Sequence, residues 1–232
     1  MQKLFLKAMH SLSDTVFVFD LDDTLYSERS YELSGITAAW NKLSELYPDI
    51  SNTIPLESLL VKPQHWVDLI FQIEPTISTL SRDSLLDIYR SHFPTIKLYY
   101  DSSQLLSFLV RNKAKMAMIT DGRSLSQRQK LKALNIENLF KPIQISEETG
   151  HPKPNSESYL AIETLYPNYQ YLYVGDNPMK DFVTPNMLGW KTFGLKDRGN
   201  NVHPQLNKSY EMIYMPQVWI NRLNELIPLF SK

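Results

Sequence analysis

The chain of 232 residues contains no cysteine, which excludes disulfide bonds, thiolate catalysis and metal sites with sulfur ligands. It has no run of roughly 18 to 20 apolar residues, the length that a membrane-spanning helix needs, so we expect no membrane partner. The 24 basic and 25 acidic residues nearly balance, and no overall charge favours nucleic acid. The N-terminal stretch MQKLFLKAMHSLSD is too interrupted by polar residues to predict a signal peptide, and we expect a cytoplasmic protein.

Short apolar runs alternate with helical patterns through most of the chain. Strands are predicted at VFVF (16–19), KMAMIT (115–120), PIQI (142–145), QYLYVG (170–175) and KTFG (191–194). Helices are predicted between them, starting near Asp101, Ser124, Ser156 and Met179. This alternation indicates an α/β fold with a Rossmann-like parallel sheet that helices cover on both faces. We expect EMIYM (211–215) to add a strand, and a last helix to reach Phe230.

Residues 28–96 carry helical patterns only. Apolar residues mark one face of each of three predicted helices: Ile36, Ala39, Trp40, Leu43, Leu46 and Tyr47; Trp66, Leu69, Ile70 and Ile73; Leu85, Leu86, Tyr89 and Phe93. We expect an all-helical domain (28–96) inserted into an α/β core (1–27 and 97–232). Within this insertion, packing roles are expected for His65, Trp66, Tyr89 and His92.

Polar side chains follow three of the predicted strands: Asp20, Asp22 and Asp23; Thr120 and Asp121; Asp176 and Asp181. The carboxyl ends of parallel strands share one edge of the sheet, so these side chains would meet at one site. Gathered carboxylates repel one another unless a cation holds them, and oxygen ligands without histidine or cysteine favour Mg²⁺. Asp23 is expected instead to cap a helix or to support the site from behind.

These residues resemble the four motifs of the haloacid dehalogenase superfamily, in its phosphatase branch with a helical cap. The sequence contains DxDxT as Asp20, Asp22 and Thr24, a strand-terminal Thr120, Lys153 in HPKPN, and GDxxxxD as Asp176 and Asp181. The resemblance covers about residues 14–30 and 97–200. The insertion is similar to the family only in its position and helical character.

The resemblance implies a role for each motif residue. Asp20 would be the nucleophile that forms an aspartyl-phosphate. Asp22, two residues along an extended chain and so on the same side, would protonate the leaving oxygen and later take a proton from water. The phosphoryl oxygens would be held by the Thr120 hydroxyl, the backbone of Asp121 or Gly122, and Lys153.

The same resemblance implies a Mg²⁺ site. Its ligands would be the carboxylates of Asp20 and Asp176 and the backbone carbonyl of Asp22. Three further residues are expected just outside these ligands: Thr24, Asn177 and Asp181.

The implied function is that of a Mg²⁺-dependent phosphomonoester hydrolase, monomeric or homodimeric, that acts on a small phosphorylated metabolite. A nucleoside monophosphate, flavin mononucleotide or a sugar phosphate fits, and the aromatic residues of the insertion favour a flat ring. Dehalogenases need neither the acid at Asp22 nor a metal, so carbon–halogen cleavage is disfavoured. A phosphomutase of the same superfamily and a receiver-like phospho-acceptor protein stay open as alternatives, as does the role of Arg123.

Overall fold

The structure is a computed structural model that describes residues 11–75, 77, 80–203, 205 and 211–230. The first ten residues, where we expected no signal peptide, lie outside this part of the chain. The described residues form a six-stranded sheet in the order β3-β2-β1-β4-β5-β6, with every neighbouring pair parallel. The strands are β1 (Thr15–Phe19), β2 (Lys115–Thr120), β3 (Ile143–Ile145), β4 (Gln170–Gly175), β5 (Lys191–Leu195) and β6 (Val218–Ile220). The predicted α/β fold is confirmed.

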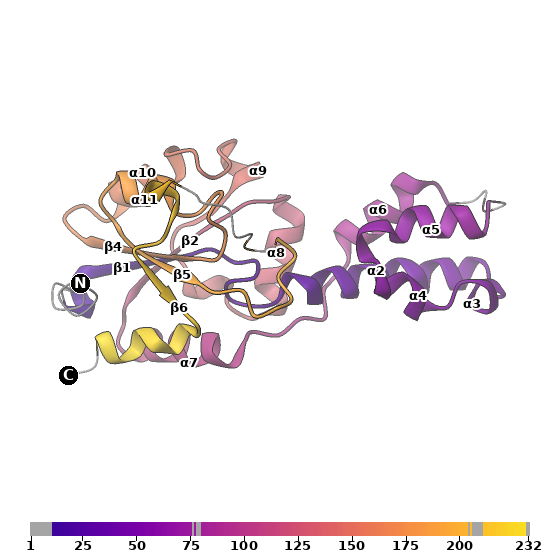
Figure 1. Ribbon diagram of the computed structural model, residues 1–232, viewed down its shortest axis with the longest axis horizontal. Coiled ribbons are helices and arrows are strands. Elements are labelled where there is room, and N and C mark those ends of the chain that lie inside the picture. Colours follow the sequence, from indigo (N-terminus) through magenta and orange to yellow (C-terminus); the bar gives the residue numbers. More distant parts are fainter. Residues whose placement is uncertain (1–10, 76, 78–79, 204, 206–210, 231–232) are drawn as a thin grey trace.

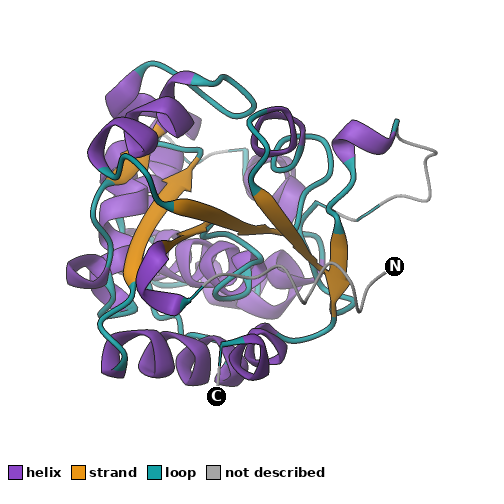
Figure 2. Ribbon diagram, turned by 90° about the vertical axis from the view of Figure 1, so that its left-hand side faces the viewer, coloured by secondary structure: helices purple, strands orange, loops and turns teal. Residues whose placement is uncertain are grey.

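Strand β1 lies in the middle of the sheet, and all five of its residues are buried. A continuous apolar run suits this position because helices cover both faces of the sheet. Phe17 and Phe19 belong to one hydrophobic cluster, and Val16 and Val18 to the cluster on the opposite face. Figure 2 shows helices on both sides of the strands. The first cluster is covered by α7 (Tyr100–Arg111), α8 (Ser124–Ala133) and the 3₁₀ helix η5 (Leu223–Leu229), the second by α10 (Glu157–Leu165) and α11 (Val183–Met187).

Short helices complete the connections of the sheet: η1 (Leu12–Asp14), η3 (Glu137–Leu139), α9 (Ser146–Thr149) and η4 (Met212–Tyr214). None of the helices in the described part of the chain combines the length and the apolar composition needed to span a bilayer.

A second group of helices extends away from one end of the sheet (Figure 1). They are α2 (Glu28–Leu46), α3 (Ile50–Thr53), α4 (Leu56–Val61), η2 (Pro63–His65), α5 (Trp66–Ile73) and α6 (Arg82–Ser91). These helices enclose a hydrophobic cluster of their own, built around buried residues such as Ile36, Leu43, Ile70 and Leu85. We therefore keep 28–96 as the proposed limits of a cap domain.

Three residues expected on the buried faces of these helices are exposed instead. Leu46 is 45% exposed, Ile73 39% and Phe93 64%. Leu46 and Ile73 are the last residues of α2 and α5, and Phe93 lies beyond the end of α6, just before Pro94. A helical face does not continue past the end of its helix, so the periodicity predicted burial too far along the chain.

Within the inserted helices, His92 contacts residues of both α2 and α6. One ring nitrogen of His92 lies 2.6 Å from the carbonyl oxygen of Tyr89 and the other lies 3.1 Å from the Ser34 hydroxyl. The rings of Trp66 and Tyr89 lie 5.8 Å apart. The expected packing roles are confirmed for these three aromatic side chains, whereas His65 is exposed.

The C-terminal strand lies later in the chain than predicted. EMIYM contains the 3₁₀ helix η4, and the strand β6 follows Pro216. The Asn186 amide donates to the carbonyl oxygens of Ile213 and Met215, so a side chain takes the acceptors that a neighbouring strand would have used. The last helix is a 3₁₀ helix with Pro228 inside it.

Asp101 was expected to mark a helix start, but its side chain links three segments. Both carboxylate oxygens accept from Arg198, at 3.0 and 2.6 Å, and one also accepts from the backbone N–H of Leu223 at 2.7 Å. The Asp101 side chain is only 7% exposed. Helix α7 itself begins one residue earlier, at Tyr100.

We expect Asp101→Ala to lower the free energy of unfolding by about 2 to 3 kcal/mol, because it leaves a guanidinium and a buried N–H without their acceptor. Urea denaturation of the two proteins measures this change. Asp87→Ala, at an exposed aspartate in α6, is the matched control and should shift stability by about 0.5 kcal/mol or less. Equal effects of the two substitutions would contradict the linking role of Asp101.

Candidate active site

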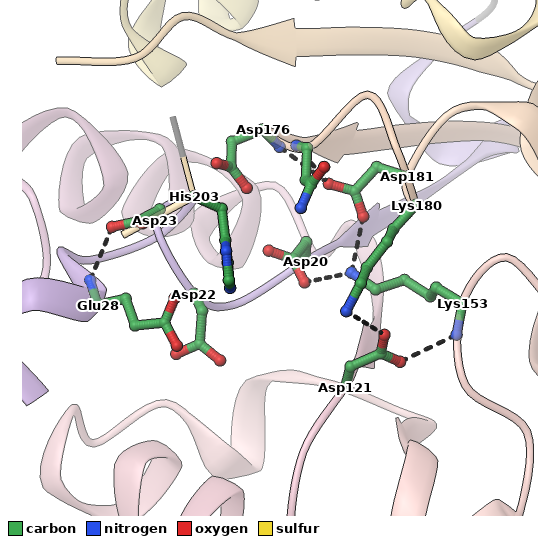
Figure 3. A pocket seen from close by; sticks show the side chains of 11 residues that line it. Asp20, Asp22, Asp23, Glu28, Asp121, Lys153, Asp176, Lys180, Asp181 and His203 are labelled. Carbon is green, nitrogen blue, oxygen red and sulfur yellow. Dashed lines mark hydrogen bonds and ion pairs between the residues drawn. The ribbon is translucent and has the colours of Figure 1, made fainter. Parts of the chain in front are cut away.

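The carboxyl ends of β1, β2 and β4 meet at one edge of the sheet, where a pocket opens (Figure 3). Asp20, Asp121 and Asp176 each follow directly after one of these strands. Among the described residues, those that line the pocket are all polar, namely Asp20, Asp22, Asp23, Glu28, Asp121, Lys153, Asp176, Asn177, Lys180, Asp181 and His203. Of the site residues predicted from the sequence, Thr24, Thr120 and Gly122 do not line it.

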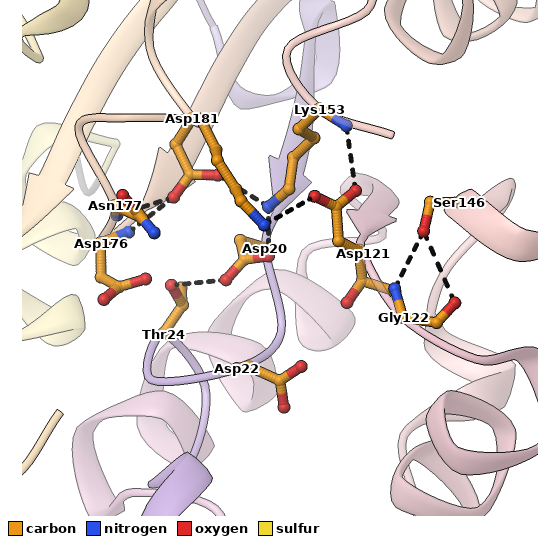
Figure 4. A network of polar contacts seen from close by, with 12 residues as sticks. Asp20, Asp22, Thr24, Asp121, Gly122, Ser146, Lys153, Asp176, Asn177 and Asp181 are labelled. Carbon is orange, nitrogen blue, oxygen red and sulfur yellow. Dashed lines mark hydrogen bonds and ion pairs between the residues drawn. The ribbon is translucent and has the colours of Figure 1, made fainter. Parts of the chain in front are cut away.

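Asp20 is held in place by two side chains. Its Oδ1 lies 2.5 Å from the Lys153 ammonium, and its Oδ2 accepts from the Thr24 hydroxyl at 3.2 Å (Figure 4). Burial raises the pKa of Asp20 to about 7; Lys153 opposes this rise, and the carboxylates of Asp181 and Asp22 add to it. A cation close to Asp20 would favour its ionised form.

Asp181 fixes Lys153 from the other side. Its Oδ1 lies 2.7 Å from the Lys153 ammonium and accepts from the Tyr173 hydroxyl at 3.1 Å. Its Oδ2 accepts from the backbone N–H groups of Asp176 and Asn177, at 3.1 and 2.8 Å. Hydrogen-bond donors therefore occupy both oxygens of Asp181.

Glycine at position 175 leaves the space that this carboxylate occupies. A Cβ atom built on Gly175 would lie 2.5 Å from Oδ2 of Asp181. This distance is far below van der Waals contact, so only glycine fits here without moving Asp181.

The carboxylates of Asp20, Asp176 and Asp181 each offer an oxygen, and these atoms lie within 4.8 Å of one another. Because Asp181 is already saturated by donors, Asp20 and Asp176 are the better candidates for binding a metal ion. Burial raises the pKa of Asp176 well above its ordinary value, and Asp181 and Asp20 add to the rise. Such a group of buried oxygen ligands, with no histidine or cysteine among them, fits Mg²⁺.

The Asp22 carboxylate points away from Asp20 (Figures 3 and 4) and is bound by three donors. Tyr26 and Lys130 donate to its Oδ1 at 2.5 and 2.7 Å, and Gln127 donates to its Oδ2 at 2.9 Å. Burial alone would raise the pKa of Asp22, but the Lys130 ammonium and the three hydrogen bonds hold it below its ordinary value. Each aspartate of the DxD motif thus contacts a different lysine: Asp20 is buried beside Lys153, and the half-buried Asp22 lies beside Lys130.

Thr120 ends β2, and Asp121 and Gly122 form the turn that follows. The Thr120 hydroxyl accepts from Gln127 at 2.6 Å, and Asp121 accepts from the backbone N–H of Lys153 at 3.0 Å. The backbone N–H of Asp121 or Gly122 was expected to hold a phosphoryl oxygen; that of Gly122 donates to the Ser146 hydroxyl at 2.9 Å. Gly122 has a φ of +144°, a conformation that side chains rarely adopt, so the glycine shapes the turn rather than lining the pocket.

Asp23 bonds to the start of helix α2, as expected of a capping residue, and it also lines the pocket. Its oxygens accept from the backbone N–H of Glu28, at 2.8 Å, and from that of Val202, at 2.7 Å. Glu28 is the first residue of α2, so one carboxylate connects the start of that helix to the loop after β5. In the same loop, the Asn201 amide donates to Asp176 at 2.7 Å.

Several residues around the site were not predicted from the sequence: Tyr26, Glu28, Gln127, Lys130, Lys180, Asn201 and His203. Gln127 and Lys130 carried a usable signal, because they are three residues apart on the helical face that also buries Leu131. The loop residues carried no periodic signal. Arg123, whose role was left open, precedes α8 and lines a different pocket with Arg90 and Glu147.

Comparisons with known proteins agree with this geometry. A family model described as haloacid dehalogenase-like hydrolase matches residues 15–182. The chain is 27% identical over 227 residues to the glyceraldehyde 3-phosphate phosphatase of Methanocaldococcus jannaschii. This alignment covers 91% of this chain and 95% of that protein. It is 26% identical over 197 residues to the phosphatase of the same name from Methanopyrus kandleri, which covers 77% of this chain and 82% of that protein.

Among solved structures, the HAD-hydrolase YfnB from Bacillus subtilis, bound to magnesium, has a TM-score of 0.62. The match covers 94% of this chain and 99% of that one at 18% identity, so it shows the shared fold alone. The family match, with two phosphatases among the relatives, confirms the expected enzyme class, a phosphoric monoester hydrolase. With strand-end carboxylates, a buried lysine and a family model that spans most of its length, the chain belongs to the haloacid dehalogenase-like hydrolase family.

Proposed function

We propose that this protein hydrolyses a small, acyclic phosphomonoester in a Mg²⁺-dependent reaction that passes through an aspartyl-phosphate on Asp20. The observation that carries the proposal is the buried contact of Asp20 with Lys153, 2.5 Å long, beside the carboxylates of Asp176 and Asp181. A carboxylate placed at a strand end among groups that neutralise charge is suited to accept a phosphoryl group.

In this proposal Asp20 Oδ attacks phosphorus, and the bond from phosphorus to the substrate oxygen breaks. Asp22 gives a proton to that leaving oxygen and later takes one from the water that cleaves the aspartyl-phosphate. Lys153 lies against both Asp20 and Asp181, which fixes its ammonium where negative charge develops on the phosphoryl oxygens. The Thr120 hydroxyl accepts from Gln127 and so keeps its own hydrogen for a phosphoryl oxygen.

Mg²⁺ would be held by the carboxylates of Asp20 and Asp176 and by the backbone carbonyl of Asp22. When bound, the ion supplies positive charge that offsets repulsion between Asp20 and the phosphoryl group. Thr24, Asn177 and Asp181 would support these ligands, and the Asn201 amide would orient the Asp176 carboxylate.

The substrate class is inferred from the wall of the pocket. Trp66 and Tyr89 of the insertion pack against each other, and the lining of the pocket in the described residues contains no phenylalanine, tyrosine or tryptophan. A flat ring, as expected from the sequence, would therefore find only the imidazole of His203 to stack on among these residues. Charged and amide side chains suit the hydroxyl and carbonyl groups of a short chain, and the two relatives named above are glyceraldehyde 3-phosphate phosphatases.

We expect glyceraldehyde 3-phosphate to be hydrolysed with a kcat/KM at least about tenfold above that of flavin mononucleotide, a nucleoside monophosphate or a hexose phosphate, the order of selectivity that pocket contacts supply. Release of inorganic phosphate with Mg²⁺ present measures this ranking. Chelation of the metal should stop the release, and added Mg²⁺ should restore it. A mutase would rearrange its substrate without net release of phosphate, and preferred hydrolysis of flavin mononucleotide would contradict the substrate class.

A further inference from the structure

Helix α8 presents two buried polar side chains to the active site. Gln127 and Lys130 lie three residues apart, and both contact the Asp22 carboxylate. We propose that Gln127 and Lys130 are positioning residues that fix the Asp22 carboxylate for proton transfer to and from the substrate. This inference rests on the proposed function, because it assigns Asp22 the acid and base role described there.

Lys130 is the stronger of the two contacts. Its side chain is 5% exposed, and its ammonium lies 2.7 Å from Asp22 Oδ1. The ammonium also lies 4.3 Å from the ring centroid of Tyr31, in helix α2. Burying an ammonium is costly unless a partner compensates, so this lysine and Asp22 hold each other in one arrangement.

The position of Lys130 is itself fixed by the packing of α8. The next residue, Leu131, is fully buried in the cluster beneath the sheet. On its other side, α8 bonds to the end of helix α6: Ser126 donates to the carbonyl of Arg90 at 2.8 Å, and Gln129 to that of Ser91 at 3.0 Å. The Lys130 ammonium is therefore held by a helix that packs against both the sheet and the cap helices.

Gln127 connects two motifs that are far apart in the sequence. Its amide nitrogen contacts Asp22 Oδ2 at 2.9 Å, Thr120 Oγ at 2.6 Å and the carbonyl oxygen of Asp121 at 3.1 Å. One side chain thus sets the distance between the proposed acid and base and the proposed phosphoryl-binding hydroxyl. Tyr26 adds the third donor to Asp22, from the loop that carries Asp22 itself.

A positioning residue and a merely structural residue can be distinguished by the substrates that their loss affects. An alkyl phosphate needs its leaving oxygen protonated, whereas an aryl phosphate with a stable leaving anion needs this less in its first step. If Lys130 acts through Asp22, its loss should affect the alkyl substrate much more than the release of aryl alcohol. A general loss of fold would affect both equally.

The experiment compares Lys130→Met with the parent on glyceraldehyde 3-phosphate and on an aryl phosphate. We expect single-turnover cleavage of the alkyl substrate to slow by about 10²-fold, the usual effect of a misplaced catalytic group, with the aryl burst nearly unchanged. The KM and the Mg²⁺ requirement should also change little. Lys132→Met, at an exposed lysine two positions along α8, is the matched control and should match the parent. Lys130→Arg should recover part of the loss because it restores the positive charge.

Equal losses on both substrates, or undiminished alkyl cleavage by Lys130→Met, would overturn the inference. If that variant fails to fold, as its melting curve would reveal, Gln127→Met removes the neutral contact instead. Both substrates should then slow, because Thr120 also loses its donor, and the alkyl substrate should slow much more. If the parent releases phosphate from no ester, the proposed function is wrong. Crystal structures then still decide the positioning role: an Asp22 side chain that keeps its place in Lys130→Met overturns it, and a displaced one supports it.

Discussion

Asp20→Asn is expected to abolish the hydrolysis of every phosphate ester, with a loss on the order of 10⁵-fold or more, as when an enzyme loses its nucleophile. An amide cannot form the aspartyl-phosphate on which both halves of the proposed reaction depend. Alkyl and aryl esters should be affected alike, because the loss precedes any demand on the leaving group. Phosphate release measures turnover, and the intact mass of rapidly quenched parent and variant measures the covalent phosphoryl group.

The substitution keeps the shape of the side chain, and Lys153 retains its contact with Asp181. The fold should therefore survive, which circular dichroism and thermal unfolding test. Asp14→Asn changes an exposed aspartate next to the same strand and is the matched control. Substantial turnover by Asp20→Asn, or a quenched parent that carries the phosphoryl group elsewhere, would contradict the assignment.

Asp176→Asn should raise the Mg²⁺ concentration needed for half-maximal activity by about 10- to 100-fold or more, because a hard cation loses a negative ligand. Thermal unfolding gives a readout that does not depend on turnover. Saturating Mg²⁺ should raise the melting temperature of the parent, since the folded state alone holds the complete site, and should raise that of the variant much less.

Without Mg²⁺, the order of stability of the parent and Asp176→Asn should reverse. The parent then buries the Asp176 carboxyl close to Asp20 and Asp181, where burial and these neighbours raise its pKa and disfavour its charged form. The amide carries no charge, so metal-free Asp176→Asn should be at least as stable as the metal-free parent. Asp14→Asn again provides the comparison. An unchanged Mg²⁺ requirement would remove Asp176 from the ligands, and a large loss of stability in chelator would show that its charge serves the fold instead.

Much of the core was predictable because each strand is short, apolar and followed at once by a polar turn. Burial on both faces leaves such a run few alternatives, and the observed strands begin and end close to the predicted ones. The strand predicted at EMIYM was wrong because of a contact with a residue far away in the sequence, which a local pattern cannot reveal. Those residues are apolar enough for a strand, but the Asn186 side chain takes the backbone oxygens on either side of Tyr214.

The residues of the candidate site also fall into a predictable group and an unpredictable one. Asp20, Thr120 and Asp176 stand at strand ends, so sequence order and sheet geometry together bring them to one edge. Lys130 and Gln127 reach Asp22 from 108 and 105 residues away. No spacing rule connects such partners, and only the packing of α8 against the sheet brings them together. Asn201 lies in an irregular loop, where neither helical nor strand periodicity marks a residue.

The absence of a side chain at Gly175 has a consequence for how this enzyme tolerates change. A single methyl group there would press on Asp181, and Asp181 holds Lys153, which in turn holds Asp20. A side chain added at this uncharged position on β4 would thus displace Asp181, then Lys153, and finally Asp20, the proposed nucleophile. Position 175 should therefore be as intolerant of substitution as the charged residues, although it carries no functional group, and a redesign that preserves only the acids and the lysine would still fail.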